Sequence, residues 1–184
     1  MSAPRRRKRF HTDTSITLIH TRTRVAAAAT EAAVAAVTEM PRQRASIEEE
    51  SIAEVRAVYR DLAARPIERN CELRTQCCHF NLTGKTPYLT RGEALVAARA
   101  LKATGRKTLP ARNDGACPLL ETSTSRCLIY EDRPFGCRTH FCAAAGGPYT
   151  RREVIDLIRR LETIDEQLGG EGPRALPSAI PAVL

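Results

Sequence analysis

Seven cysteines crowded into the middle of the chain constrain its fold more than any other feature of the sequence. They are Cys71, Cys77, Cys78, Cys117, Cys127, Cys137 and Cys142, and none lies elsewhere in the 184 residues. Thiolates are soft, anionic ligands that suit zinc and iron–sulfur chemistry. The cluster therefore predicts a site in which thiolates hold a metal and tie together loops that are remote in the sequence.

The rest of the chain disfavours a secreted disulfide framework, because the cysteine count is odd and no leading apolar stretch is present. The segment 25–37 is an Ala run interrupted by Glu31. No stretch reaches the roughly 20 apolar residues that a membrane helix needs. We expect a reduced, cytoplasmic protein without membrane contact, although the acid-poor, Ser-, Thr- and Arg-rich residues 1–24 leave an organellar transit segment open.

Aromatic residues are scarce, with no Trp, four Phe and four Tyr in the whole chain. Six of these eight lie between Phe80 and Tyr149, among the cysteines. A small core that is poor in aromatic side chains supplies little stability, and a bound metal can add what is missing.

The net charge of +8 is concentrated at the N-terminus, where residues 1–24 carry seven basic side chains and only one acidic side chain. A basic tail of this kind binds nucleic acid or an anionic surface by releasing counterions. Runs of like charge are also commonly solvated arms. Nucleic-acid binding through Arg5–Arg9 therefore stays one of several hypotheses.

Three segments carry a start signal of helices, a Ser or Thr followed three residues later by Glu. The signals begin at Ser46, Thr90 and Thr150, and apolar residues at helical spacing follow each of them. The predicted helices span about 46–64, 90–105 and 150–169.

Other segments are less clearly specified. Residues 25–40 are Ala-rich and favour a helix, residues 128–130 form the one short strand candidate, and three prolines after residue 171 indicate an irregular tail. We expect a mainly α fold, a small helical domain with long, cysteine-rich, metal-ordered loops between its helices. The expected organisation is a basic, Ala-rich and partly disordered extension at 1–44, a metal-binding domain at 45–170 and a Pro-containing tail at 171–184.

The cysteine spacing is C-x5-C-C, then 38 residues, then C-x9-C-x9-C-x4-C. It fits neither the paired C-x2–4-C knuckles of zinc fingers nor ferredoxin patterns. Seven thiols also exceed one four-coordinate site. The sequence leaves open a single site with spare thiols, two sites, or one site with a redox-active pair, and His79 or His140 could complete a second site.

The second half of the cluster carries a more specific signal in the peptides C-P-L-L at 117–120, C-L-I-Y at 127–130 and R-P-F-G-C-R at 133–138. In this order they resemble the YkgJ-type cysteine-cluster family, a zinc- or iron-chelating domain. The family pattern is C-x2-C-x2-C-C, followed by C-P-F-L, C-x-I-Y and R-P-x-x-C-R. The resemblance covers residues 71–142 and implies that the seven cysteines are candidate ligands of zinc or an iron–sulfur cluster.

The first half of the cluster departs from this pattern, because Arg74 stands at the position of the second family cysteine. A guanidinium stays protonated and cannot serve as an ordinary metal ligand. Our hypothesis is that Arg74 instead donates hydrogen bonds to sulfur and offsets its negative charge.

Three functions remain open at this point. The first is a metal-binding protein that holds zinc or an iron–sulfur cluster. This function is compatible with a protein partner, and we expect such a protein not to be an enzyme by itself. The second is a cluster-dependent enzyme or accessory factor related to protein lysine N-methylation. The resemblance implies this function, because flagellin lysine N-methylases carry a similar cysteine cluster. The third is a nucleic-acid-associated zinc protein. Phosphate-binding, dinucleotide-binding and serine-hydrolase motifs are absent from the sequence.

Overall fold

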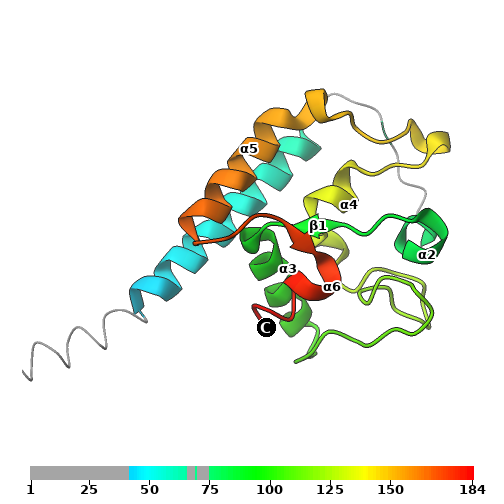
Figure 1. Ribbon diagram of the computed structural model, residues 1–184, viewed down its shortest axis with the longest axis horizontal. Coiled ribbons are helices and arrows are strands. Elements are labelled where there is room, and N and C mark those ends of the chain that lie inside the picture. Colours follow the sequence, from blue (N-terminus) through cyan, green and yellow to red (C-terminus); the bar gives the residue numbers. More distant parts are fainter. Residues whose placement is uncertain (1–41, 66–68, 70–74) are drawn as a thin grey trace, which may run out of the picture. The chain divides into compact units, whose positions relative to one another are not determined.

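The computed structural model describes residues 42–65, 69 and 75–184, and within these ranges the fold is mainly helical, as predicted (Figure 1). The long helices are the segment 42–63, α3 (Arg91–Ala103) and α5 (Arg151–Gln167). The short helical elements are η1 (Thr75–Cys78), α2 (Phe80–Thr83), η2 (Tyr130–Asp132), α4 (Phe135–Thr139), η3 (Ala143–Ala145) and α6 (Leu176–Ala179). A two-stranded antiparallel sheet pairs β1 (Tyr88–Leu89) with β2 (Arg174–Ala175).

Chain contacts divide the protein after Arg44, and residues 45–184 form one compact unit. Of the preceding unit, residues 42–44 are described and are helical. The basic segment 1–24, the Ala-rich segment 25–40, Cys71 and Arg74 lie outside the described residues. Within the described part of the chain, no helix has the length and apolar character needed to cross a bilayer.

Both of the later helices begin as predicted. Thr90 caps α3 and forms a capping box with Glu93, whose Oε2 accepts a hydrogen bond from the Thr90 backbone N–H at 3.0 Å. Thr150 and Glu153 form the same motif at α5, where the corresponding bond is 2.6 Å. These side chains satisfy backbone donors that the first helical turn leaves free.

The first long helix begins earlier than predicted. Residues 42–45 are already helical, so Ser46 and Glu49 lie inside the helix and not at its cap. Glu49 instead forms an ion pair with Arg99 of α3. The predicted apolar face is confirmed; it buries Ile52, Val55, Val58, Tyr59 and Leu62.

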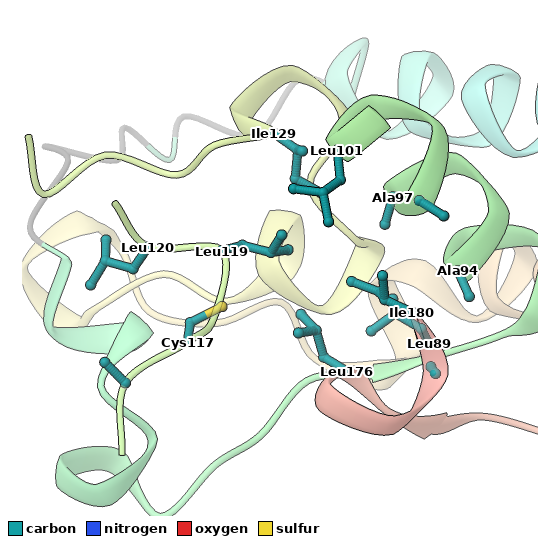
Figure 2. Packing of buried hydrophobic residues seen from close by; sticks show 13 residues of the cluster. Leu89, Ala94, Ala97, Leu101, Cys117, Leu119, Leu120, Ile129, Leu176 and Ile180 are labelled. Atoms are coloured by element: carbon teal, nitrogen blue, oxygen red, sulfur yellow. The ribbon is translucent and has the colours of Figure 1, made fainter. Parts of the chain in front are cut away.

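Helix α3 contributes to two apolar clusters. The helical cluster packs α3 through Val96 against the helix 42–63 and α5. The C-terminal cluster joins another part of α3 to the cysteine-rich loop and α6 (Figure 2). Its labelled members are Leu89, Ala94, Ala97, Leu101, Cys117, Leu119, Leu120, Ile129, Leu176 and Ile180.

The C-terminal residues are more regular than the expected irregular tail. Arg174 pairs with Leu89 across the small sheet, and the one-turn helix α6 follows. Leu176 and Ile180 are 1% and 0% exposed. Proline is tolerated in a first helical turn, where its missing N–H would have no intrahelical partner, so Pro177 does not prevent this turn. Burial of apolar residues four apart makes the segment part of the core.

A buried aspartate fixes the path into this segment. Asp165 of α5 accepts hydrogen bonds from the backbone N–H groups of Arg91 at 2.5 Å and Gly172 at 2.9 Å. A Cβ on Gly170 would lie 2.3 Å from the Asp165 carboxylate. Glycine at position 170 therefore allows the chain to pass close to the Asp165 carboxylate, which links α5 to the start of α3.

The expected strand at residues 128–130 does not form. Tyr130 instead begins η2, and the local pairing is a single bridge between Leu120 and Cys127. The Leu128 N–H also donates to the Leu119 carbonyl at 2.8 Å. The β-prone side chains pack in the apolar core without extending this contact into a ladder.

Glu93 joins three segments through one buried carboxylate. Its Oε1 accepts hydrogen bonds from the Tyr59 hydroxyl at 3.3 Å and the Phe135 N–H at 2.8 Å. Its Oε2 accepts from the backbone N–H and the hydroxyl of Thr90. Burial raises the pKa of this carboxyl, while these hydrogen bonds act to lower it. The carboxylate thereby connects the helix 42–63, the start of α3 and the start of α4.

We predict that Glu93→Gln lowers the free energy of unfolding by about 1–3 kcal/mol, because each carboxyl oxygen accepts a backbone N–H and the amide nitrogen must face one of them. Urea unfolding followed by circular dichroism measures the change. The matched control is Glu153→Gln, which alters the exposed capping box of α5 and should lower the free energy of unfolding by much less than Glu93→Gln does, because solvent screens this site. Equal losses in the two variants would contradict the role assigned to Glu93.

We also predict that Gly92→Ala destabilises the fold by about 1–3 kcal/mol, despite the better helix propensity of Ala. A Cβ at Gly92 would lie 2.9 Å from the Cγ2 atoms of both Val55 and Ile164, which are buried and branched. The control is Gly136→Ala in α4, where the nearest atom, Pro87 Cβ, is 3.8 Å away. Thermal unfolding should give a lower Tm for Gly92→Ala and a nearly unchanged Tm for Gly136→Ala; the reverse order would refute the close packing at Gly92.

Candidate metal centre

The described cysteines lie in the connections between the long helices, as the sequence predicts. Cys77 and Cys78 end η1, and Cys137 is the third residue of α4. The remaining described cysteines, Cys117, Cys127 and Cys142, lie in irregular segments. Short helices and loops thus carry the thiols, while the long helices form the scaffold beside them.

Main-chain hydrogen bonds bring the two halves of the cysteine cluster together. The Cys117 N–H donates to the Cys78 carbonyl at 2.6 Å, and the Asn81 N–H donates to the Gly115 carbonyl at 3.3 Å. Gly115 has φ of 69°, and a Cβ there would lie 2.9 Å from the Asn81 Cβ. Glycine therefore permits the close approach that places Cys78 beside Cys117.

Five thiols share one cavity of about 910 Å³. They are Cys77, Cys78, Cys117, Cys127 and Cys137. His140 also lines this cavity, whereas His79 and Cys142 are not among its lining residues, and Cys142 is exposed. The structure thus gathers most of the candidate ligands on one surface, and it separates Cys142 from them.

Burial and mutual proximity shift the pKa values of these thiols. Burial raises the pKa of Cys117 to about 11, and it raises the pKa of Cys127 and Cys137 as well. The charges of Cys117 and Cys127 raise the pKa of Cys137 further. A hydrogen bond between the two adjacent thiols lowers the pKa of Cys77 to about 6 and raises that of Cys78.

Arg133 supplies positive charge to this group of thiols. Its charge lowers the pKa of Cys77, Cys127 and Cys137. Its guanidinium carbon lies 4.1 Å from the centroid of the Tyr130 ring, a cation–π contact. Its Nε is buried and has no hydrogen-bond partner in the part of the chain that the structure describes. An N–H group placed in this way is suited to hydrogen bonding with a thiolate.

Arg138 holds the same loop from the other side. Its guanidinium lies 4.3 Å from the centroid of the Tyr59 ring. Its Nε donates to the Arg133 carbonyl at 2.8 Å, and its Nη2 donates to the carbonyl of Glu131. Burial lowers the pKa of Arg138. These contacts attach the segment 133–138, which carries Cys137, to the helix 42–63.

The carboxylates near the cysteines are engaged in ion pairs. Asp132 accepts two hydrogen bonds from Arg56, at 3.0 and 2.8 Å. Glu121 pairs with Arg106 at 3.0 Å. The first pair connects the cysteine-rich loop to the helix 42–63, and the second lies within the loop itself.

The donor set fits a thiolate metal centre in its chemistry. Five thiols line one cavity and Arg133 offers an unpartnered N–H beside them. Across the described residues, however, no group of three His, Cys, Asp or Glu side chains is arranged so that it could hold a metal ion as it stands. Coordination by Cys117, Cys127 and Cys137 would require these thiols to lose the protons that their raised pKa values retain.

Sequence reasoning missed the groups that position the thiols. The capping pattern places Glu93 in the first turn of a helix, and nothing in that pattern indicates that its carboxylate also accepts a hydrogen bond from the Phe135 N–H at the start of α4. The pairing of Arg56 with Asp132 is equally remote, because 76 positions separate the two residues. No local motif marks either contact.

Comparison with known proteins supports the family resemblance. No curated protein and no solved structure matches the chain. The sequence model of the CxxCxxCC family, described as a "putative zinc- or iron-chelating domain", matches residues 68–159, a range that contains all seven cysteines. This match spans half of the 184 residues. The chain therefore belongs to the CxxCxxCC family of zinc- or iron-chelating domains.

Proposed function

We propose that this protein binds zinc or iron, the latter as an iron–sulfur cluster, through the thiolates of its central cysteines. The observation that supports this most directly is the shared cavity. Five cysteines line it, and they come from both halves of the cysteine cluster. Thiolates are the ligands that zinc and iron–sulfur clusters prefer.

We propose four ligands from the five cysteines that line the cavity. Three of them are Cys117, Cys127 and Cys137, and the fourth is either Cys77 or Cys78. Four thiolates around Zn²⁺ carry a net charge near −2, which the cation at Arg133 offsets. Cys71 and Cys142 stay predicted ligands on the basis of the sequence alone.

A bound metal would cross-link the loop 106–149 to the segment around η1, and an iron–sulfur cluster would add electron transfer. The loop is more than 40 residues long and contains only short helical turns. Loops of this length in compact domains commonly serve a function or need an additional constraint. Binding energy released on coordination would therefore stabilise the folded state.

The first prediction from this proposal concerns the purified protein. Anaerobic purification followed by elemental analysis should find about one equivalent of zinc, or iron with inorganic sulfide, per chain. A colourless protein with zinc indicates a zinc site, whereas a broad visible absorption band with iron and sulfide indicates a cluster. A folded protein without either metal would contradict the proposed function.

Two serine variants form a matched pair for this measurement. Cys137→Ser removes a thiol from the cavity wall and should lower metal affinity more than about tenfold. Cys142→Ser removes an exposed thiol that does not line the cavity and should retain the metal. Retention in Cys137→Ser would count against the cavity as the binding site, and loss in Cys142→Ser would add Cys142 to the ligands.

We further predict that zinc affinity rises with pH between pH 6 and 8. The pKa values of Cys117, Cys127 and Cys137 are raised, to about 11 for Cys117, so these thiols are protonated in this range and must release protons on binding. The apparent affinity should increase about tenfold per pH unit for each proton released. Competition with a chromophoric chelator measures the slope, and a flat profile would exclude these thiols as ligands.

A further inference from the structure

The aromatic residues of this chain are concentrated on the wall of the thiol cavity. Six of the eight Phe and Tyr side chains line it: Phe80, Tyr88, Tyr130, Phe135, Phe141 and Tyr149. In a chain with 4% aromatic residues, this distribution is unusual, because large aromatic side chains ordinarily contribute most by filling the core. Tyr88 even exposes 62% of its surface. Phe135 is itself buried in the helical cluster, so the other five rings, each at least partly exposed, form the surface that borders the cavity.

The cavity extends well beyond the thiols. Its lining includes Leu119 and Leu176 from the C-terminal cluster, and Val154 and Leu161 of α5 from the helical cluster. A volume of about 910 Å³ falls in the range of sites for small organic molecules, which runs from about 300 to 1,000 Å³. A single metal ion bound by the thiols would leave much of this volume free.

The charged groups of the cavity wall are of both signs, so the wall selects neither a cation nor an anion. The exposed ones are Lys85, Arg126, Glu131, Arg151 and Glu162. The buried Glu93 already accepts hydrogen bonds from Thr90, Tyr59 and Phe135, and Arg133 acts on the thiols. Transfer of an unpaired ion into such a site is costly, so an uncharged ligand is favoured.

We propose that the cavity is a binding site for an uncharged, planar, largely apolar organic molecule that stacks on its aromatic wall. Aromatic rings prefer offset or tilted partners at centroid distances of about 4.5–7 Å. Phe141 and Tyr149 already form one such tilted pair at 6.0 Å on the wall. The inference rests on the wall and the volume of the cavity, and it is independent of which metal the thiols bind.

Equilibrium dialysis with naphthalene-2-methanol tests this proposal on the full-length protein as purified. Naphthalene fluorescence on the protein-free side of the dialysis membrane reports the free probe, so protein emission does not interfere in the wild type or in any variant. We expect saturable binding of one molecule per chain. Naphthalene-2-carboxylate and naphthalene-2-methylammonium have the same ring system with opposite charges, and both should bind at least about tenfold more weakly.

Three variants locate the bound probe. Tyr88→Ala removes an exposed part of the aromatic wall and should weaken binding several-fold, up to about tenfold. Ile158→Trp fills the cavity from α5 and should abolish binding. The matched control is Leu82→Ala, because Leu82 is 71% exposed and does not line the cavity; its binding should equal that of the wild type. If Ile158→Trp does not fold, the comparison of Tyr88→Ala with Leu82→Ala still decides the matter.

Absence of saturable binding at millimolar probe would overturn the inference, and so would equal weakening in Tyr88→Ala and Leu82→Ala. Tighter binding of either charged analogue would overturn the assignment of an uncharged ligand. Metal content is measured in the same samples. If the protein binds the probe but contains no metal, the aromatic site stands and the proposed metal-binding function is contradicted. If the protein contains metal but does not bind the probe, the metal-binding function stands and the aromatic site is contradicted.

Discussion

The buried carboxylate of Glu93 is the contact on which the arrangement of the other parts depends. It accepts hydrogen bonds from Thr90 in its own capping box, from Tyr59 in the helix 42–63, and from Phe135 at the start of α4. A buried carboxylate is costly unless donors surround it. Because the donors come from three segments, the cost of burying the carboxylate is offset only when all three segments are in place. The Glu93 side chain therefore specifies tertiary structure as well as the start of α3.

Backbone hydrogen bonds and core packing join the parts of the scaffold beside the thiols. Helix α3 contributes to both apolar clusters, and the hydrogen bond from Cys117 to Cys78 joins the two halves of the cysteine-rich region. The sequence suggested that metal coordination orders these loops. The structure adds backbone contacts and core packing, which also bring thiols from both halves of the cluster to one cavity.

The sequence predicted the features that depend on neighbouring residues. Helices α3 and α5 follow from capping boxes and apolar spacing, which act within a few positions. The same pattern at Ser46 failed because Ser and Glu at this spacing also occur inside helices, and only the preceding turn decides between the two. The thiol donors could be named from their chemistry, whereas the packing of Leu176 and the bond from Phe135 to Glu93 depend on contacts between distant segments that no local motif encodes.

Two arginines of the segment 133–138 pack against tyrosine rings. Arg133 and Arg138 rest on the rings of Tyr130 and Tyr59, and among the described residues neither forms an ion pair with a carboxylate. A carboxylate partner would cancel most of the positive charge that each presents to its surroundings, while a tyrosine ring holds the guanidinium in place and leaves its charge largely available. Thiolates held at close range repel one another. Aromatic anchoring thus keeps the Arg133 cation beside Cys77, Cys127 and Cys137, where it favours the deprotonated state that metal binding requires.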